Sequence, residues 1–493
     1  MKKRIGFFLF ALLLTGVLTA CGGESKNSDS EEYDSSNAVS VVFSENEIEV
    51  SEEDGCQISG TDLTIGQSGT YLVSGSCGDG SVTVKKGTED VTIVLNGISL
   101  TSADSAPLVC GKNSRVDIVA ASGTTNTLAD TEANNDETHP ENTEAENAVL
   151  KCKDGSAVTL RGAGTLSIEA NGKNAIKAGA ASDETQDTEF VIRELMLSID
   201  ASVNDGIHSE IPVRIQSGML SIQAADDAIH SDDEITIGED GSDGPEIAIS
   251  DCYEGIEALL VNALSGTVTI HSEDDCINAA NSERSDYPFA VCISGGEFRM
   301  DSTSGDGIDS NGTIEISGGT VLVWTANRAD NQPLDADGEI AITGGTLLAA
   351  GGSSGMGMKL SGTQAYAAFG NTAFSSPMNG GGMSGERPEM PQMSGREKPE
   401  RNGEMPPEPP SGKPGDFAGG DFPGGGAETL LVSGSAFTIA DADGEVLYSG
   451  TALCDAGYVF FSAPKCGSGS SLTLTAGEDV VSTADSVLPD SKE

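Results

Sequence analysis

Apolar and polar residues alternate along most of the chain in short runs that break at glycine. Alternation with a period of two is typical of β-strands that bury one face. The runs around paired glycines show it most clearly: Ile293-Ser294-Gly295-Gly296, Thr313-Ile314-Glu315-Ile316, Ile316-Ser317-Gly318-Gly319, Thr320-Val321-Leu322-Val323 and Ile342-Thr343-Gly344-Gly345. The pattern predicts three short strands with tight corners in each repeat.

A second phrase recurs between the glycine pairs and ends on an isoleucine. The isoleucines are Ile176, Ile207, Ile229, Ile256, Ile277 and Ile308, separated by 31, 22, 27, 21 and 31 residues, and Leu334 follows 26 residues later. An acidic residue stands two positions before five of these isoleucines. A repeat of this length with three strands and no helical period is typical of a parallel β-helix.

We therefore predict an all-β fold, a parallel β-helix in which each coil buries its branched aliphatic residues. Neighbouring coils would stack at the strand spacing of about 4.8 Å, and glycine would mark corners where the backbone needs a positive φ or a close approach. A β-sandwich array and a β-propeller are the alternatives. Propeller blades run to about 40 residues or more, so the propeller fits this spacing poorly.

Stacked coils would gather the acidic residues into rows. Two carboxylates about 4.8 Å apart repel by roughly 3.5 kcal/mol at an effective dielectric constant of about 20, so they must be solvated, protonated or bridged by a cation. Calcium prefers such oxygen ligands, and we predict calcium sites here; a solvated acidic face is the alternative. The predicted ligands are Asp205, Asp226, Asp227, Glu254, Glu257, Asp274, Asp275, Asp306 and Asp309.

Two histidines occupy equivalent positions of the motif, directly after the isoleucine. His208 and His230 lie 22 residues apart and would stack on successive coils. Together with Asp205 and Asp227 they could form a two-histidine metal site. The alternative is that each is a surface histidine with satisfied hydrogen bonds.

The charge balance limits the classes of partner. The 493 residues contain 26 Lys+Arg and 78 Asp+Glu, a formal net charge of −52. Phosphate backbones bind basic residues, so this balance argues against nucleic acid or an anionic membrane surface as a partner. Aromatic residues make up only 4%, with a single tryptophan, Trp324. The core is therefore expected to consist of small and branched side chains.

The N-terminus carries the features of an export signal. Lys2, Lys3 and Arg4 precede an apolar stretch too short to span a bilayer comfortably. The stretch ends in Leu-Thr-Ala-Cys, which resembles the lipobox of bacterial lipoproteins, and the resemblance implies lipidation of Cys21. An ordinary secretory cleavage site is the alternative. In either case we expect an exported protein, and with lipidation one anchored at the outer face of the cell membrane.

The remaining chain divides by composition. We predict a lipoprotein signal peptide at 1–20, a flexible spacer at 21–40, a parallel β-helix with its N-terminal cap at 41–370, a Gly/Pro/Met-rich disordered linker at 371–427 and a small β unit at 428–486 that caps the solenoid. Export permits disulfides. Cys56 with Cys77 and Cys454 with Cys466 are candidate pairs.

The phrases D-D-A-I-H-S, G-D-G-I-D-S and I-S-G-G-T, followed by the Gly/Pro/Met-rich stretch, resemble a family of surface carbohydrate-binding β-helix proteins of clostridia and related Gram-positive bacteria. The resemblance covers about residues 41–485. It implies a right-handed parallel β-helix similar to pectate lyases, with calcium bound along the coils and affinity for cellulose or acidic pectin. The aspartate of the motif is replaced at Asn174 and Glu254, where the implied calcium ligation is in doubt.

The chain offers few aromatic side chains on which a sugar ring could stack. We name Trp324, Tyr253 and Tyr287 as sugar-stacking platforms, and Lys177 and Arg328 as cations that meet the carboxylates of an acidic polysaccharide. Scattered surface charge that relieves an acidic body is the alternative role for the two cations. We expect a monomer.

A polysaccharide lyase is the enzymatic alternative. Such an enzyme would use calcium to acidify the proton beside the uronate carboxylate and Lys177 to remove it. Acidic surroundings raise the pKa of a lysine, which disfavours it as a base, and we assign no catalytic residue. A surface adhesin or spacer without sugar affinity is the third interpretation. We predict a calcium-dependent carbohydrate-binding protein.

Overall fold

A computed structural model describes residues 33–182, 188–281, 287–328, 331–352, 358–370 and 428–489. In these ranges every regular element is a β-strand. The described residues contain no helix that is long and apolar enough to cross a membrane. The all-β prediction is thus confirmed for these residues. The predicted signal peptide, Cys21, most of the predicted spacer and the predicted linker at 371–427 lie outside them.

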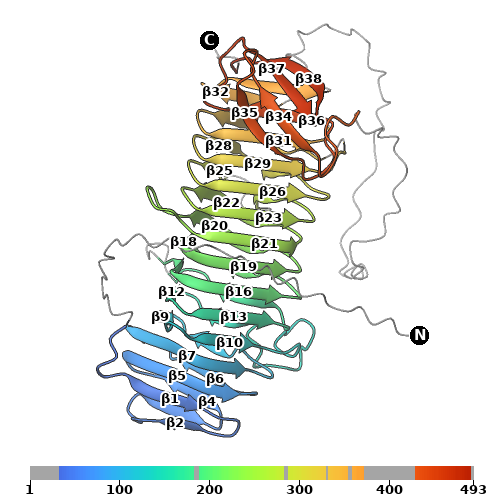
Figure 1. Ribbon diagram of the computed structural model, residues 1–493. Coiled ribbons are helices and arrows are strands. Elements are labelled where there is room, and N and C mark those ends of the chain that lie inside the picture. Colours follow the sequence, from blue (N-terminus) through green and yellow to red (C-terminus); the bar gives the residue numbers. More distant parts are fainter. Residues whose placement is uncertain are drawn as a thin grey trace, which may run out of the picture. The chain divides into compact units, whose positions relative to one another are not determined.

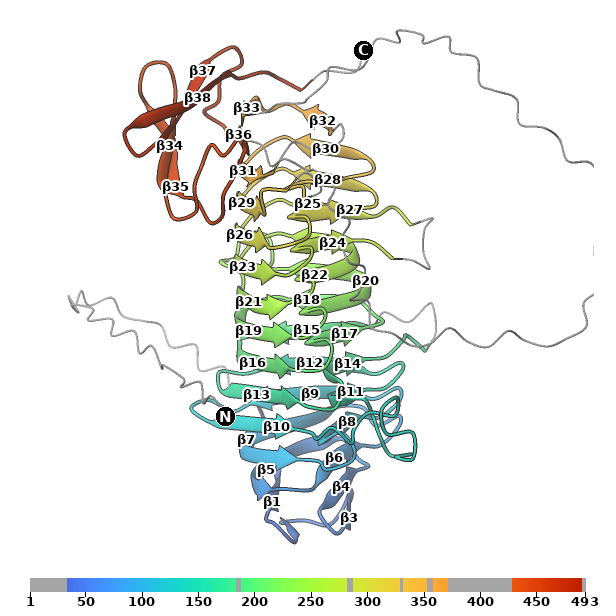
Figure 2. The same ribbon diagram turned by 90° about the vertical axis from the view of Figure 1, so that its right-hand side faces the viewer.

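Most strands belong to one large, mainly parallel sheet that bends into three faces. The chain returns to the same face after about three strands, so that β9 pairs with β12, β10 with β13 and β11 with β14. Figure 1 shows the coils stacked one above another, and Figure 2 shows the strands of the three faces in three stacks. This pairing agrees with the predicted parallel β-helix. Its right-handedness stays a prediction.

The first face, called the motif face below, carries the repeated isoleucines. Its strands are β3 (Cys56–Ser59), β4 (Asp62–Ile65), β6 (Ser81–Val84), β8 (Leu108–Cys110), β11 (Ala148–Cys152), β14 (Asn174–Ala178), β17 (Ile207–Ser209), the first part of β20 (Ile229–Ile237), the first part of β22 (Ile256–Ala263), β24 (Ile277–Ala279) and β27 (Ile308–Ser310).

The second face contains the later parts of β20 and β22, which bend from one face to the next. Its other strands are β1 (Val39–Phe43), β2 (Ile48–Val50), β5 (Gly69–Cys77), β7 (Val91–Thr101), β9 (Arg115–Ala120), β12 (Ala157–Arg161), β15 (Phe190–Arg193), β18 (Val213–Ile215), β25 (Ala290–Ile293), β28 (Thr313–Ile316), β30 (Glu339–Ile342) and β32 (Lys359–Gly362).

The third face completes each coil, and the ends of β5 and β7 also reach it. It consists of β10 (Thr125–Ala129), β13 (Thr165–Ala170), β16 (Leu195–Ala201), β19 (Gly218–Ala224), β21 (Glu246–Cys252), β23 (Thr267–Ser272), β26 (Glu297–Ser302), β29 (Thr320–Thr325), β31 (Thr346–Gly351), β33 (Tyr366–Gly370) and β36 (Tyr458–Ser462).

The repeated isoleucines lie directly opposite one another on the motif face. The paired register runs without a break from Ile176 through Ile207, Ile229, Ile256 and Ile277 to Ile308, and an isolated bridge joins Ile308 to Leu334. All of these side chains are buried in one continuous apolar core. The predicted alignment is therefore confirmed, and the unequal spacing in sequence is taken up at corners and bulges.

The glycine pairs lie at corners where successive coils come very close. The second glycine of each pair has a positive φ: 84° at Gly296, 72° at Gly319 and 76° at Gly345. A Cβ built on Gly319 would lie 2.6 Å from the carbonyl oxygen of Gly296, and one on Gly345 would lie 2.5 Å from that of Gly318. Only glycine fits these corners without strain.

The C-terminal residues contribute strands to two sheets. β36 pairs antiparallel with both β31 and β33, so it lies between them at the last coils. A separate four-stranded antiparallel sheet consists of β35 (Val446–Thr451), β34 (Ala436–Ala440), β37 (Ser471–Ala476) and β38 (Asp479–Asp485). The predicted β unit thus exists in the described residues, while its role as a cap stays a prediction.

The candidate disulfides are wrong. All nine cysteines within the described ranges are free, including Cys56, Cys77, Cys454 and Cys466. Cys77 is buried in the core of the first coils, and Cys466 packs in the apolar cluster of the C-terminal unit. These thiols act as small hydrophobic side chains.

Candidate functional site

Two rows of polar residues run along the motif face because the repeats stack in register. The turn row holds the residue two positions before each isoleucine, and the strand row holds the residue after it. The turn row is Asn174, Asp205, Asp227, Glu254, Asp275, Asp306 and Gln332. The strand row is Lys151, Lys177, His208, His230, Glu257, Asn278, Asp309 and Asp335.

Backbone hydrogen bonds between coils hold the turn-row carboxylates in place. The Asp227 N–H donates to Asp205 Oδ1 at 3.3 Å, the Asp306 N–H to Asp275 Oδ1 at 2.7 Å, and the Gln332 N–H to Asp306 Oδ1 at 2.5 Å. Each of these carboxylates therefore accepts a bond from the next coil. In each case the donor is the backbone N–H at the same motif position of the following repeat.

Burial and mutual repulsion raise the pKa values of these carboxyl groups. Burial is the main cause at Glu254, with a pKa of about 8, at Asp275 and Asp306, with values of about 7, and at Asp309, with a value of about 6. Neighbouring carboxylates add to the effect. A nearby cation would stabilise the ionised form of such a carboxyl group.

The first of two tight clusters contains a histidine. His230 Nδ1 lies 2.9 Å from Asp227 Oδ2 and 2.9 Å from Glu257 Oε2, and its Nε2 lies 3.3 Å from Asp232 Oδ1. Burial by itself lowers the pKa of His230, but the hydrogen bonds to these three carboxylates outweigh it and raise the pKa to about 12. One potential ligand atom from each of Asp227, His230 and Glu257 lies within 4.8 Å of the others.

The second cluster is composed of carboxylates alone. Asp306, Asp309 and Asp335 each place a carboxylate oxygen within 4.8 Å of the other two. None of the three residues brings a positive charge to balance the others. Asp335 Oδ2 accepts a hydrogen bond from Gln332 Nε2 at 3.2 Å. Asp335 was not among the ligands predicted from the sequence, although its neighbour Leu334 continues the isoleucine series and gave the signal needed to find it.

The other predicted ligands lie along the same corner at different depths. Asp205 is almost fully buried, and its Oδ2 contacts His208 Nδ1 at 2.7 Å. Asp226 is exposed, and partial desolvation together with the nearby carboxylates of Asp205 and Glu257 raises its pKa. Asp274 is half-buried and follows Tyr253 in the stack, with its N–H donating to the Tyr253 carbonyl oxygen at 2.8 Å. The predicted acidic residues thus share one side of the coils.

The strand row changes sign along the stack of coils. Lys151 and Lys177 are paired in register at one end, the histidines follow, and Asp309 and Asp335 are the last members. Lys177 Nζ lies 3.9 Å from Glu210 Oε1. Burial lowers the pKa of Lys151, and neighbouring Lys177 adds to the shift.

Of the predicted sugar contacts, Trp324 is wrong as a platform. Its side chain is 2% exposed and packs edge-on against Phe437 of the C-terminal unit, with ring centroids 5.9 Å apart. Arg328 is exposed, as its predicted role requires. Tyr253, which was also named as a platform, is 44% exposed at the acidic corner. It lines a pocket of about 370 Å³ together with His271 and Glu273, among other residues.

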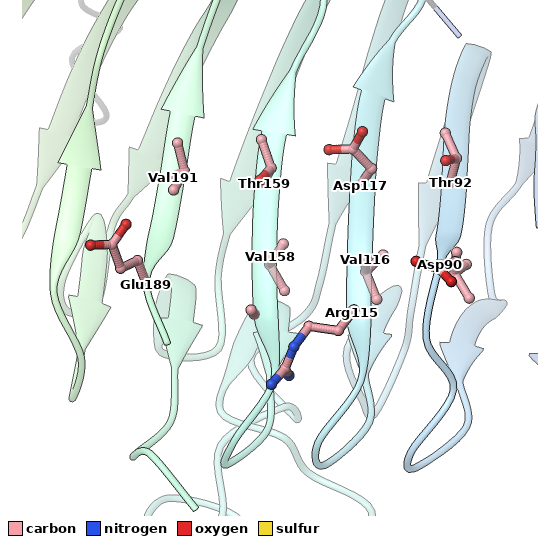
Figure 3. Close-up of a pocket in the computed structure, with 11 residues that line it drawn as sticks. Asp90, Thr92, Arg115, Val116, Asp117, Val158, Thr159, Glu189 and Val191 are labelled. Carbon is pink, nitrogen blue, oxygen red and sulfur yellow. The ribbon is translucent and has the colours of Figure 1, made fainter. Parts of the chain in front are cut away.

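A larger pocket of about 530 Å³ lies on the second face. Figure 3 shows Arg115, Asp117, Thr159 and Glu189 among its lining residues, with Asp117 and Thr159 on neighbouring strands. Two of its acidic groups have basic partners, because Arg161 contacts Asp117 at 2.7 Å and Arg214 contacts Glu189 at 2.6 Å. It therefore differs from the motif face, where three carboxylates converge without a basic side chain among them.

Comparison with known proteins places the chain in a family. A protein of Acetivibrio thermocellus described as a carbohydrate-binding domain-containing protein is 30% identical over 167 residues, which are 34% of this chain and 57% of that relative. The chain thus spans little more than half the length of the relative.

A solved structure titled as the polysaccharide lyase-like protein from C. thermocellum, gadolinium derivative, is 21% identical to this chain. The alignment covers 62% of this chain and 97% of the other, with a TM-score of 0.37. The family model described as carbohydrate-binding domain-containing protein matches residues 59–357. That match spans more than half of the 493 residues, and the chain belongs to this carbohydrate-binding domain-containing family.

Proposed function

We propose that this protein is a non-catalytic, calcium-dependent carbohydrate-binding protein that holds acidic plant-type polysaccharides, with cellulose as the neutral alternative. Membership of the family supports carbohydrate binding. The proposal of calcium and of an acidic ligand depends on the cluster of Asp306, Asp309 and Asp335. In this cluster three carboxylates converge, and none of the three residues is basic.

The three residues fit calcium by distance and by chemistry. Calcium takes 6–8 or so oxygen ligands at about 2.4 Å, so two oxygens on the same ion lie at most about 4.8 Å apart. The three carboxylate oxygens meet that limit. Asp275 lies one coil away in the turn row and adds negative charge beside the cluster. Water and a sugar carboxylate would complete the coordination shell.

A calcium ion held in this way would attract a polyuronate on its open side. The ion is bound by protein carboxylates on one side and would bind the carboxylate of the sugar on the other. Tyr253 supplies the exposed ring that could pack against a sugar face near the same corner. The acidic body by itself would repel a polyuronate, so binding without calcium is expected to be weak.

The same proposal includes the placement of the protein. We propose a right-handed coil, export through the signal at 1–20, and a lipid anchor on Cys21 at the outer face of the cell membrane. A monomer would then present its motif face to polysaccharide outside the cell. Radiolabelled acyl-chain incorporation that is lost in C21A would support the anchor, and incorporation retained in C21A would contradict it.

The lyase alternative is disfavoured by distance. Lys177, its candidate base, lies on β14, and Asp309 lies on β27, five coil steps later in the strand row. At about 4.8 Å a step, the two are roughly 24 Å apart. A base and a calcium ion must act on the same sugar unit, so Lys177 and this cluster cannot form one catalytic site.

Retention on insoluble polysaccharide tests the proposal. The purified protein is incubated with polygalacturonate or cellulose in the presence of calcium or EGTA, and the absorbance of unsaturated products is followed. We expect retention on polygalacturonate that EGTA abolishes, and no product. Product formation would establish a lyase instead. Failure to bind either polymer would leave a surface spacer.

The variant D309N tests the site within that function. We expect at least about tenfold weaker retention on polygalacturonate in calcium, because the cluster loses one of its three charged ligands. The matched control is D200N, which makes the same change on the exposed surface of the third face. Equal retention of D309N and the wild-type protein would contradict the site assignment.

A further inference from the structure

The histidine cluster of the motif face is chemically different from the carboxylate cluster. His230 Nδ1 faces two carboxylate oxygens, Asp227 Oδ2 and Glu257 Oε2, both at 2.9 Å. A ring nitrogen carries at most one hydrogen. A single N–H therefore cannot give each carboxylate a full hydrogen bond, whereas a cation that displaces the Nδ1 proton to solvent and lies between all three atoms would contact both carboxylates.

The other side of the ring has the partner that a metal-binding histidine needs. His230 Nε2 lies 3.3 Å from Asp232 Oδ1, so an Nε2–H can donate to that carboxylate while Nδ1 faces the cluster. Histidines that bind metals usually donate their second ring N–H to a carboxylate or carbonyl, which fixes the tautomer. Asp232 fills that role here.

The ring is also fixed by its neighbour on the preceding coil. His208 stacks on His230 with ring centroids 4.9 Å apart and an angle of 3° between the planes. His208 Nδ1 is itself held by Asp205 Oδ2 at 2.7 Å. The side chains of the cluster are partly enclosed, with exposures of 11% for Asp227, 17% for His230 and 21% for Glu257.

We propose that Asp227, His230 Nδ1 and Glu257 form a site for a borderline divalent cation, with Zn²⁺ as the expected ion, separate from the calcium cluster. One imidazole nitrogen and two carboxylates suit Zn²⁺, whereas calcium takes oxygen ligands almost exclusively. Metal selectivity would therefore change along the motif face, from Zn²⁺ near β20 to calcium near β27. This site does not depend on carbohydrate binding.

Calorimetric titration of the full chain with Zn²⁺ in millimolar calcium tests the proposal. Millimolar calcium would occupy the proposed carboxylate site, so the Zn²⁺ that binds reports on the histidine cluster. We expect one strong site in the wild-type protein, at least about 100-fold weaker binding in H230Q, and about 10-fold weaker binding in D232N because the outer carboxylate is lost. D309N is expected to keep the Zn²⁺ site while losing calcium-dependent retention.

Two controls keep the result specific. H271Q removes a histidine paired with Asp301 on the third face at 2.5 Å and is expected to bind Zn²⁺ as the wild-type protein does. Replacing Zn²⁺ with Co²⁺ gives a visible spectrum that separates nitrogen and oxygen ligands from cysteine sulfur. E257Q, with its fold checked by circular dichroism, serves as a second variant if H230Q is unstable.

Three outcomes would overturn the proposal. The first is Zn²⁺ affinity unchanged in both H230Q and E257Q. The second is a thiolate charge-transfer band in the Co²⁺ spectrum, which would move the metal to cysteine. The third is displacement of Zn²⁺ by millimolar calcium, which would make this position another calcium site.

Discussion

At the residue scale, the motif face concentrates carboxyl groups that are costly to ionise. Asp275 and Asp306 each accept a backbone hydrogen bond from the next coil, which favours the ionised form, yet burial outweighs it. A protein that keeps such groups at a repeated position must gain from them elsewhere. The proposed cation binding would supply such a gain, because the spacing of these groups permits it.

The pH dependence of stability follows from the same groups. The pKa values of Asp275 and Asp306 are about 7 in the folded protein, above the ordinary 3.8. The folded state therefore holds more protons than the unfolded state between about pH 4 and pH 7, and stability falls as pH rises through that range. In EGTA we expect Tm to fall by several degrees from pH 5 to pH 8.

Differential scanning calorimetry checks this expectation. Calcium should restore Tm at pH 8 and have less effect at pH 5, because it binds the ionised carboxylates. D306N should flatten the profile in EGTA, since one titrating group is gone. A Tm in EGTA that rises steadily from pH 5 to pH 8 would contradict the assignment of raised pKa values.

At the element scale, the pairing of the strands can be predicted from the local alternation of apolar and polar residues. The roles of the side chains can be predicted in this way only in part. The isoleucine period is enough to predict the register of the motif face, because a one-residue slip would expose every buried side chain. Trp324 was misplaced because Phe437, which covers it, lies more than a hundred residues later in the chain. The local alternation of apolar and polar residues does not reveal such a contact.

The residues of the acidic site were likewise predicted only in part. Asp306 and Asp309 belong to a clear repeat, so stacking alone located them. Asp335 follows a degenerate repeat in which Pro333 and Leu334 replace the usual residues, which weakens the sequence signal, and the bridge between Ile308 and Leu334 confirms that it belongs to the row. Asp232 is outside the motif positions, and its contact with His230 depends on side-chain geometry.

The glycine corners give a test at this scale. G319A would place a Cβ 2.6 Å from the Gly296 carbonyl oxygen at a φ of 72°. Ala at such a φ costs about 1–2 kcal/mol, and the contact with backbone adds to this. We expect a clear fall in Tm, measured by circular dichroism. G123A is the matched control, because its φ is 73° and nothing lies within 4 Å of the added Cβ.

G123A should be destabilised only by the cost of placing alanine at a positive φ, without a steric contact. It should therefore remain more stable than G319A. Equal melting temperatures for the two variants would show that close coil-to-coil approach does not limit this corner. The comparison separates backbone strain from steric contact, which a single substitution cannot do.

At the scale of the whole molecule, stability is expected to be local along the stack. Each coil of a solenoid contacts mainly its neighbours, so a perturbation at one coil decays along the axis. Along the strand row the charged residues change from Lys151 on β11 to Asp309 on β27, so the proposed calcium site lies at one end of the row. Removal of the proposed calcium at one end should therefore leave the other end undisturbed.

Hydrogen exchange measured by mass spectrometry tests that locality. In EGTA we expect faster exchange in peptides that cover β24 and β27, whose coils border the cluster of Asp306, Asp309 and Asp335. Peptides covering β6 and β8 lie many coils away and should exchange at the same rate with and without calcium. D309N in calcium should reproduce the pattern of the wild-type protein in EGTA. A uniform increase along the chain would instead mean that the coils open as one cooperative unit, and the calcium effect would then not locate its site.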